Sequence, residues 1–297
     1  MHTRDGCRER NESSRDQRRR APLPCVNALA ALSSSVLVML VASSTPGTSA
    51  FCVMTTGKGS VHVCTNTSCR KAGSRGTLDI FRAFAPASVE VIETGCQGRC
   101  GLGPNVLTRP SEEIFNGVSK PATAAAIIEI YFEAPVADAL VGAFGRVSEG
   151  DVFFQRGLHA EALACYNQCI DTAGAFEGNG NALSVAKVKQ SSAMRMVAKK
   201  RGNSSGGGGV SSSSAGHVSA TLEEAEVAAR EAMDLWPANI SAWLHLCDVL
   251  VDMGRVDEAL ETLDNLKKAV PGAKFEASEK AARLRNSQRQ GSSTSFF

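Results

Sequence analysis

The sequence predicts an α/β domain at residues 61–133, followed by an all-α domain of helical repeats at residues 140–272. Two observations indicate this fold class. Between residues 61 and 133, short apolar segments alternate between the two-residue period of strands and the longer period of helices. From residue 140 onward the apolar residues keep a helical period, and the pattern itself recurs along the chain. A chain of 297 residues has room for both domains and a targeting segment.

The net charge and the number of cysteines exclude some classes of function. The formal net charge is only +2, so we expect no nucleic-acid partner. Seven of the ten cysteines follow residue 52, and an odd number argues against a complete disulfide framework. Four of these seven form two close pairs, which in a reducing compartment are more typical of a metal site than of disulfides.

Residues 1–50 have the order of a signal peptide. The first 20 residues contain seven arginines against four acidic residues, and an apolar stretch follows at residues 26–42. Small residues then lead to Ala50, as at a cleavage site. The apolar stretch is shorter than the roughly 20 residues that a transmembrane helix needs. We therefore expect no stable membrane insertion after processing, with a retained anchor as the alternative.

The residues after this segment suggest a destination. Phe51 follows Ala50 directly, and residues 51–60 contain Lys58 and hydroxyl residues but no acidic residue. The Ser-Ala-Phe junction resembles the bipartite presequence of algae with secondary plastids, in which a signal peptide precedes a transit peptide that begins with Phe. The resemblance implies a plastid (chloroplast) location, with the secretory pathway and the mitochondrion as alternatives.

The α/β domain is predicted from alternating patterns that glycine and proline interrupt. Pro86 is expected to end the first long helix, and Pro121 suits the first turn of the last helix. The expected elements are, in chain order, a strand at 61–63, a helix at 77–84, strands at 89–93, 106–108 and 113–115, and a helix at 120–132.

Two cysteine pairs in this domain are candidate metal ligands. The first pair has the spacing C-x4-C and the second C-x3-C, with 26 residues between them; the four residues are Cys64, Cys69, Cys96 and Cys100. Thiolates suit zinc or an iron–sulfur cluster, and the spacing alone does not exclude zinc. Four glycines flank the second pair, at positions 95, 98, 101 and 103. They favour a cluster because glycine allows close backbone approach and can turn amides toward sulfur. Zinc and a pair of disulfides remain alternatives.

Residues 61–133 resemble the thioredoxin-like [2Fe–2S] ferredoxins and the related small cluster-bearing subunit of respiratory NADH dehydrogenases. The resemblance rests on Cys64 and Cys69, on the glycine- and cysteine-rich run at 95–105, and on the Gly-Val-Ser-Lys-Pro segment at 117–121. It implies one [2Fe–2S] cluster on the four cysteines, near the surface, that passes single electrons to redox partner proteins. No thioredoxin-type C-x-x-C is present, so thiol–disulfide exchange is not expected.

Other residues near the cysteines have possible supporting roles. Four cations either offset the negative charge of a cluster or form a solvated surface: Arg70, Lys71, Arg75 and Arg99. Three apolar residues are candidates to shield it: Val63, Leu102 and Val106. Because nothing in the sequence supplies a substrate pocket or a general base, we expect a non-enzymatic electron carrier rather than an enzyme.

The C-terminal half has an internal period of 34 residues. Ala225 and Ala259 are separated by this distance, as are Pro237 and Pro271. Thirty-four residues is the period of tetratricopeptide repeats, which residues 140–272 therefore resemble. The resemblance implies a peptide or protein ligand on the concave face of the repeats.

The middle repeat is interrupted. Ala162 and Ala225 are 63 residues apart, an excess of 29 over one period, and much of the excess is a Gly/Ser tract at 202–219. We expect this tract to be a disordered insertion between helices at 181–200 and 222–236. About three repeats form the smallest stable stack, and residues 273–297 are expected to be a tail that passes from helix to disorder.

The remaining cysteines and His245 are interpreted as structural residues. Cys165 and Cys169 share one face of a helix, and Cys247 occupies a packing position, so none is assigned as a ligand. The favoured hypothesis is an electron-transfer protein whose repeats dock a partner. The alternatives are a scaffold or assembly factor with a structural or sensory cluster, and a zinc-bound interaction module.

Overall fold

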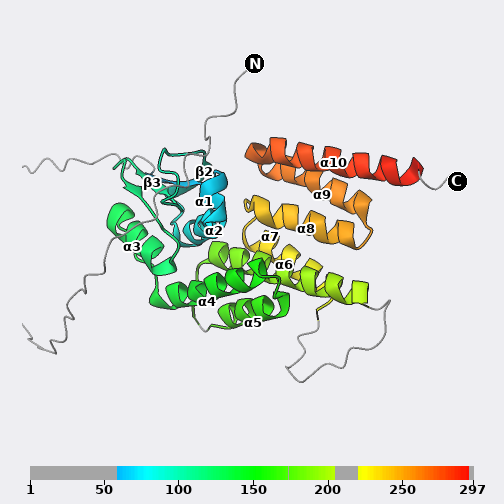
Figure 1. Cartoon of the computed structure of the whole chain (residues 1–297), viewed down its shortest axis with the longest axis horizontal. Helices are drawn as coiled ribbons and strands as arrows, with labels where there is room; N and C mark the ends of the chain where they lie inside the picture. The colour runs from blue at the N-terminus through cyan, green and yellow to red at the C-terminus, as the bar shows by residue number, and fades with distance from the viewer. Residues whose placement is uncertain (1–58, 173, 205–219, 294–297) are drawn as a thin grey trace, which may run out of the picture. The chain divides into compact units, whose positions relative to one another are not determined.

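The computed structural model describes residues 59–172, 174–204 and 220–293 (Figure 1). The chain divides into two units, residues 1–53 and 54–297, and the structural statements that follow concern the second unit. The predicted targeting segment at 1–50, residues 51–58 of the transit-like segment and residues 205–219 of the Gly/Ser tract lie outside the described residues.

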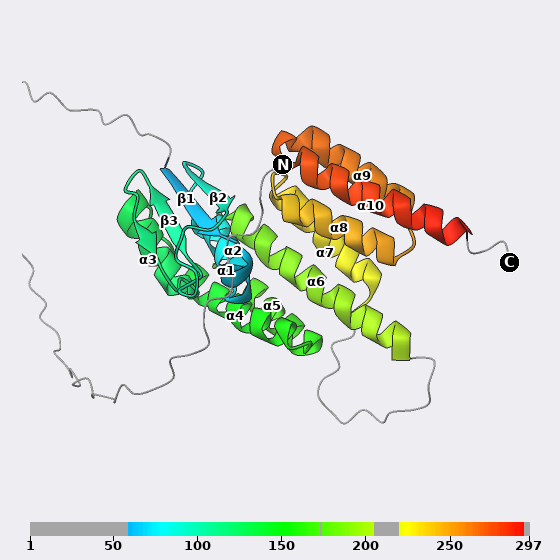
Figure 2. The same ribbon diagram turned by 45° about the horizontal axis from the view of Figure 1, so that its top comes forward.

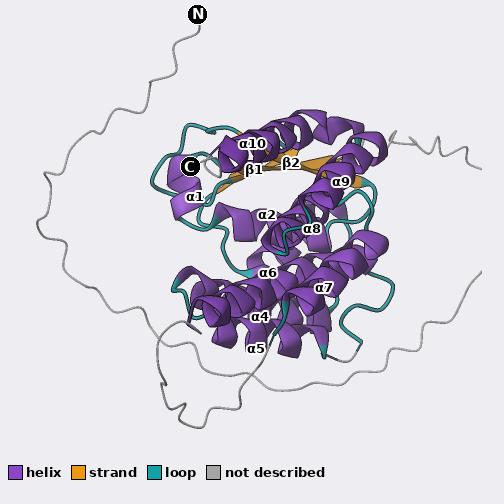
Figure 3. Cartoon of the chain, turned by 90° about the vertical axis from the view of Figure 1, so that its right-hand side faces the viewer, coloured by secondary structure: helices purple, strands orange, loops and turns teal. Residues whose placement is uncertain are grey.

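The N-terminal part of this unit contains a small mixed sheet (Figure 3). Its strands are β1 (Gly59–Cys64), β2 (Val89–Thr94), β3 (Val106–Arg109) and β4 (Ile114–Phe115), in the spatial order β2-β1-β3-β4. β1 runs parallel to β2 and antiparallel to β3, and β4 is antiparallel to β3. Each strand includes residues that the alternating pattern predicts, and Val61 and Val63 of β1 are fully buried.

Three helices accompany the sheet. α2 (Ser74–Phe84) begins three residues before the expected start and ends ahead of Pro86, while α3 (Pro121–Phe132) has its proline in the first turn, as expected. α1 (Thr67–Lys71) is not expected from the sequence, because five residues are too few to show a helical period. Its start is fixed by Asn66, whose side-chain oxygen accepts a hydrogen bond from the Thr67 N–H at 2.6 Å.

From Asp138 onward the described residues are mostly helical, and consecutive helices pack against one another (Figures 1 and 2). The helices are α4 (Asp138–Gln155), α5 (His159–Ile170), α6 (Gly180–Ser204), α7 (Leu222–Leu235), α8 (Ile240–Asp252), α9 (Val256–Ala269) and α10 (Lys274–Ser293). They form the pairs α4/α5, α6/α7 and α8/α9, after which α10 packs on α9. No helix in the described ranges is both long enough and apolar enough to span a membrane.

Two boundaries differ from the sequence-based expectation. α6 continues through Ser204, three residues into the predicted insertion, and so passes the isolated Gly202 but not the glycine run that begins at Gly206. The predicted tail is helical as far as it is described. α10 is part of the packed array, since Ala277 and Ala281 are almost completely buried beside α9.

The sheet and the first helices of the array share one hydrophobic core. The rings of Phe84 on α2 and Phe144 on α4 meet edge to face, with centroids 5.2 Å apart. Asn179, in the loop before α6, donates a side-chain hydrogen bond to the Ala83 carbonyl at 3.0 Å. α2 is therefore fixed both to the sheet and to the helical array.

Candidate functional site

The two cysteine pairs lie at one edge of the sheet. β1 and β2 are parallel, and Cys64 at the end of β1 is opposite Thr94 at the end of β2. Because parallel strands end at the same edge, Cys64 lies close to the loop that begins after Thr94 and carries Cys96 and Cys100. α1 places Cys69 one short helix after Cys64.

The two pairs differ in exposure and in chemistry. Cys64 and Cys69 are buried, whereas Cys96 and Cys100 are exposed, with their Sγ atoms 3.2 Å apart. Burial and the hydrogen bond with Cys64 raise the pKa of the Cys69 thiol. The hydrogen bond from Cys100 lowers the pKa of Cys96, and the Gly98 N–H, 3.4 Å from the Cys96 sulfur, acts in the same direction. Of the two thiols, Cys96 is thus more readily ionised than Cys69.

Side-chain amides hold the cysteine-bearing loop against the sheet. Gln97 donates to the His62 carbonyl of β1 at 3.0 Å, and Asn105 donates to the Arg99 carbonyl at 2.8 Å. The Cys64 N–H donates to the Asn105 carbonyl at 2.9 Å. The side-chain carbonyl oxygens of Gln97 and Asn105 are buried without a hydrogen-bond partner among the described residues.

The glycines around the second pair have distinct structural reasons. A Cβ on Gly103 would lie 2.6 Å from the Cys69 Sγ and 3.3 Å from its Cα, closer than van der Waals contact. Gly98 and Gly101 have φ values of +80° and +91°, which favour glycine. A Cβ on Gly95, in contrast, would meet no atom within 4 Å.

The residues expected to support the cysteine site differ in their exposure. Val63 and Val106 are fully buried, but Leu102 is 57% exposed, so its expected shielding role is not supported. The four expected cations, Arg70, Lys71, Arg75 and Arg99, are all exposed. None of them has an ion-pair partner among the residues that the structure describes.

The donor set is chemically suited to a soft metal, because it consists of four thiols within one small region. In the described ranges, however, no group of three or more His, Cys, Asp or Glu side chains is gathered closely enough to hold a metal ion. The sulfur atoms instead form a buried pair and an exposed pair. The assignment of all four cysteines to one centre stays a prediction.

The other cysteines and His245 lie in the helical core. Burial raises the pKa of Cys169 and of Cys247 to about 12, which makes both thiols poor nucleophiles and poor ligands. His245 is buried on α8, where its Nε2 lies 2.9 Å from the Ser191 hydroxyl. Burial, followed by the charge of Arg195, lowers its pKa to about 4. These residues are structural, as the sequence indicates.

A buried ion cluster joins α2, α4 and α6. The Lys189 Nζ on α6 lies 2.8 Å from an Asp79 carboxylate oxygen on α2 and 3.0 Å from one of Asp151 on α4. The Tyr166 hydroxyl donates to the other Asp151 oxygen at 2.7 Å. Burial alone would lower the pKa of Lys189, but the two carboxylates outweigh it and raise the pKa. The sequence gives no signal for this cluster, because its members are distant in the chain.

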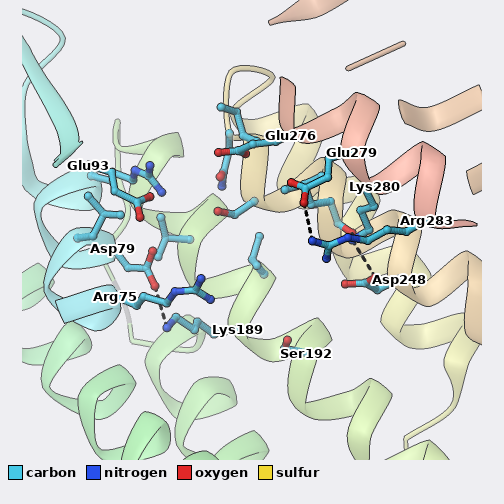
Figure 4. A pocket seen from close by; sticks show the side chains of 18 of the residues that line it. Arg75, Asp79, Glu93, Lys189, Ser192, Asp248, Glu276, Glu279, Lys280 and Arg283 are labelled. Atoms are coloured by element: carbon cyan, nitrogen blue, oxygen red, sulfur yellow. Dashed lines mark hydrogen bonds and ion pairs between the residues drawn. The ribbon is translucent and has the colours of Figure 1, made fainter. Parts of the chain in front are cut away.

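A cleft lies beside this cluster, between α2 and α10, with α6 and α8 also lining it (Figure 4). Its volume of about 810 Å³ is within the usual range of ligand sites. Two ion pairs on its wall are formed within the array, Lys280–Asp248 at 2.8 Å and Arg283–Glu279 at 2.6 Å. The sequence did not indicate this cleft, since its walls come from both halves of the chain.

A comparison with known protein families identifies the C-terminal part of the helical region. The tetratricopeptide repeat family model matches residues 220–284, which include α7, α8, α9 and the first half of α10. This confirms the predicted repeat in that part of the chain. A solved structure, the first TPR of Spaghetti (RPAP3) bound to the HSP90 peptide SRMEEVD, is 16% identical to this chain, with a TM-score of 0.35. The match covers 50% of this chain and 95% of that one. No curated protein matches the sequence.

Proposed function

We propose that the chain is a [2Fe–2S] protein that passes single electrons, and that its repeats dock a protein partner. The observation that supports the first part is that both cysteine pairs lie at the edge of the sheet where the parallel strands β1 and β2 end. Cys64, Cys69, Cys96 and Cys100 would hold the cluster, which when bound takes up and releases one electron.

Local features of the chain favour this proposal over zinc. The Gly103 backbone packs directly on the Cys69 side chain, and the Gly98 amide points to the Cys96 sulfur. Amide hydrogen bonds to sulfur tune the potential of a cluster, a property that a structural zinc site does not need. A zinc-bound interaction module is the second candidate, favoured by the exposure of the Cys96–Cys100 pair in a chain that also carries a repeat.

The docking role follows from the repeat itself. Tetratricopeptide arrays stack helix pairs and present an extended surface, which generally serves protein–protein interaction. The cysteine pairs lie in the N-terminal part of the unit, and the repeats lie in the C-terminal part. Binding of the repeats to a partner protein would therefore hold the electron carrier at that partner. We place this activity in a plastid, on the strength of the Ala50–Phe51 junction.

Reconstitution of the full chain tests the cluster. Anaerobic incubation with iron and sulfide should give a brown protein with about two irons and two sulfides per chain, and reduction should give an electron paramagnetic resonance signal. Serine at any of the four assigned cysteines should reduce or abolish iron binding. Serine at Cys165 or Cys169 is the matched control, because both lie in the helical core.

The outcomes separate the candidates. A colourless protein that binds one zinc through the same four cysteines would replace the electron carrier with the zinc module. A coloured protein that cannot be reduced reversibly would support a structural or sensory cluster in a scaffold. Loss of the visible spectrum in Cys165→Ser would show that the ligand assignment is wrong.

A further inference from the structure

The cleft between α2 and α10 contains charges that the protein itself leaves uncompensated. We propose that it binds an extended segment of the partner protein that carries one basic and one acidic side chain, the basic one at Glu93 and Glu276 and the acidic one at Arg75 and Arg82. This inference rests on the proposed docking role of the repeats and specifies the chemistry of the docked segment.

The acidic end of the cleft is formed by two walls. Glu93 on β2 and Glu276 on α10 are both exposed and line the cavity. In Figure 4 they lie at the same end of the cleft, on opposite sides. No cation of the described chain pairs with either carboxylate. Two such carboxylates that face a common space attract a lysine or arginine side chain from outside.

The cations that remain open lie along α2, on one wall of the cleft. Arg75 and Arg82 are seven residues apart on this helix, so they share one face, and both line the cavity. Neither has an ion-pair partner within the described ranges. Figure 4 shows Arg75 near Lys189, but Lys189 is already neutralised by Asp79 and Asp151. The arginines are therefore the cations that remain open to a ligand carboxylate.

The rest of the lining suits a peptide. Apolar side chains from α2, α6, α8 and α10 are interspersed with the charges: Leu78, Val185, Leu244 and Leu284. Such a mixture can bury the aliphatic part of a peptide while its charged groups pair. An isolated anion would meet as many open carboxylates as open guanidinium groups, which disfavours a simple anion site.

The cleft also adjoins the cysteine site. The Glu93 carboxylate accepts a hydrogen bond from the Thr65 hydroxyl at 2.6 Å, and Thr65 directly follows Cys64. Glu93 itself is three residues before Cys96. A protein segment in the cleft would hold its parent protein beside the cysteine-bearing edge of the sheet, where an electron donor or acceptor has to be.

The test uses the full chain and short fluorescein-labelled peptides of glycine and alanine. Each peptide carries one lysine and one glutamate, separated by one to four residues, and Lys/Lys and Glu/Glu versions serve as controls. Fluorescence anisotropy at low salt should show that at least one Lys/Glu peptide binds more tightly than both controls. Because the contacts are charged, binding should weaken as salt is added.

Charge reversal supplies the decisive comparison. Arg75→Glu and Glu276→Lys should each weaken binding of the preferred peptide about tenfold, since attraction becomes repulsion. Glu276→Lys should in addition improve binding of the Glu/Glu peptide. Glu261→Lys is the matched control, because Glu261 is exposed on α9 outside the cleft and should have no effect.

Three results would overturn the proposal: no peptide binds, all peptides bind alike, or the reversals behave like Glu261→Lys. Tighter binding of the Glu/Glu peptide to the unchanged protein would also overturn it, in favour of a simple anion site. Iron content is measured in the same samples. Normal iron loading with no peptide binding refutes the docked segment alone, whereas charge-dependent peptide binding without iron refutes the cluster alone.

Discussion

Replacement of Lys189 by methionine tests whether the ion cluster ties the sheet to the helical array. Methionine keeps an unbranched chain of similar length but removes the charge that lies 2.8 Å from Asp79 and 3.0 Å from Asp151. The substitution leaves two carboxylates facing one another with no cation between them.

The expected cost follows from the burial of the cluster. Removal of one partner of a fully buried ion pair costs about 3–5 kcal/mol. The Lys189 and Asp79 side chains keep about 20% of their exposure, so water screens the remaining charges in part. We therefore expect a loss of about 2–4 kcal/mol in the free energy of unfolding.

Urea unfolding followed by circular dichroism measures this loss. A unit of this size has an m value of about 2–3 kcal/mol per molar urea, so the midpoint should fall by about 1 M. Because one core extends from the sheet into α6, and α6 packs on α7 and α8, we expect a single transition. Addition of Asp79→Asn should restore part of the stability, since it removes one of the repelling carboxylates.

Arg146→Met is the matched control. Arg146 on α4 pairs with Glu149 at 3.0 Å, but both side chains are about half exposed, and such a pair contributes less than about 0.5 kcal/mol. A midpoint for Lys189→Met equal to that of Arg146→Met would refute the stabilising role. Two separate transitions, of which only one moves, would refute the coupling of the two parts.

Three further predictions concern other parts of the chain. Gly103→Ala should reduce iron loading, because its Cβ would lie 2.6 Å from a cysteine sulfur, whereas Gly95→Ala should load normally; equal loading by iron assay would contradict the steric argument. The folded-state pKa of His245, about 4, is below its unfolded value, so its stabilising effect is complete above about pH 6.5 and is lost as pH falls toward 4. Between pH 7 and pH 5, protonation of His245 should lower the free energy of unfolding by about 2 kcal/mol. This part of the pH dependence, measured by urea titration, should be absent in His245→Gln. A fluorescent fusion to residues 1–60 should enter the plastid of an alga with secondary plastids, and Phe51→Ala should divert it to the endomembrane system; mitochondrial import of both forms would contradict the presequence interpretation.

Much of the local structure could be predicted because glycine and proline interrupt the chain at clear positions. The strands around Val63 and Val91 and the helix that ends before Pro86 are found where the patterns place them. The recurrence of Ala225 and Ala259 identified the repeat that the family model matches. These features depend on residues close in sequence or on a fixed period, which a single sequence can reveal.

The remaining features depend on distant residues or on weak patterns. α10 is rich in charged residues, and mainly Ala277 and Ala281 face its neighbour, so its packed face has little hydrophobic contrast. The contact of Lys189 with Asp79 requires α2 to dock on α6, which no short-range pattern indicates. The cleft is likewise formed by residues that are distant in the sequence. Both its walls are known only once the two halves of the chain are brought together.

The shared core also limits how this gene can be rearranged. A cut between α3 and α4 would expose the face of Phe144 that Phe84 covers, and would leave the Ala83 carbonyl without Asn179. Each fragment would then expose an apolar surface to solvent, which favours aggregation over independent folding. A recombination event that replaces the helical array with another one therefore gives a folded protein only if the new array carries side chains that pack on α2. We therefore expect the sheet domain and the helical array to be inherited together.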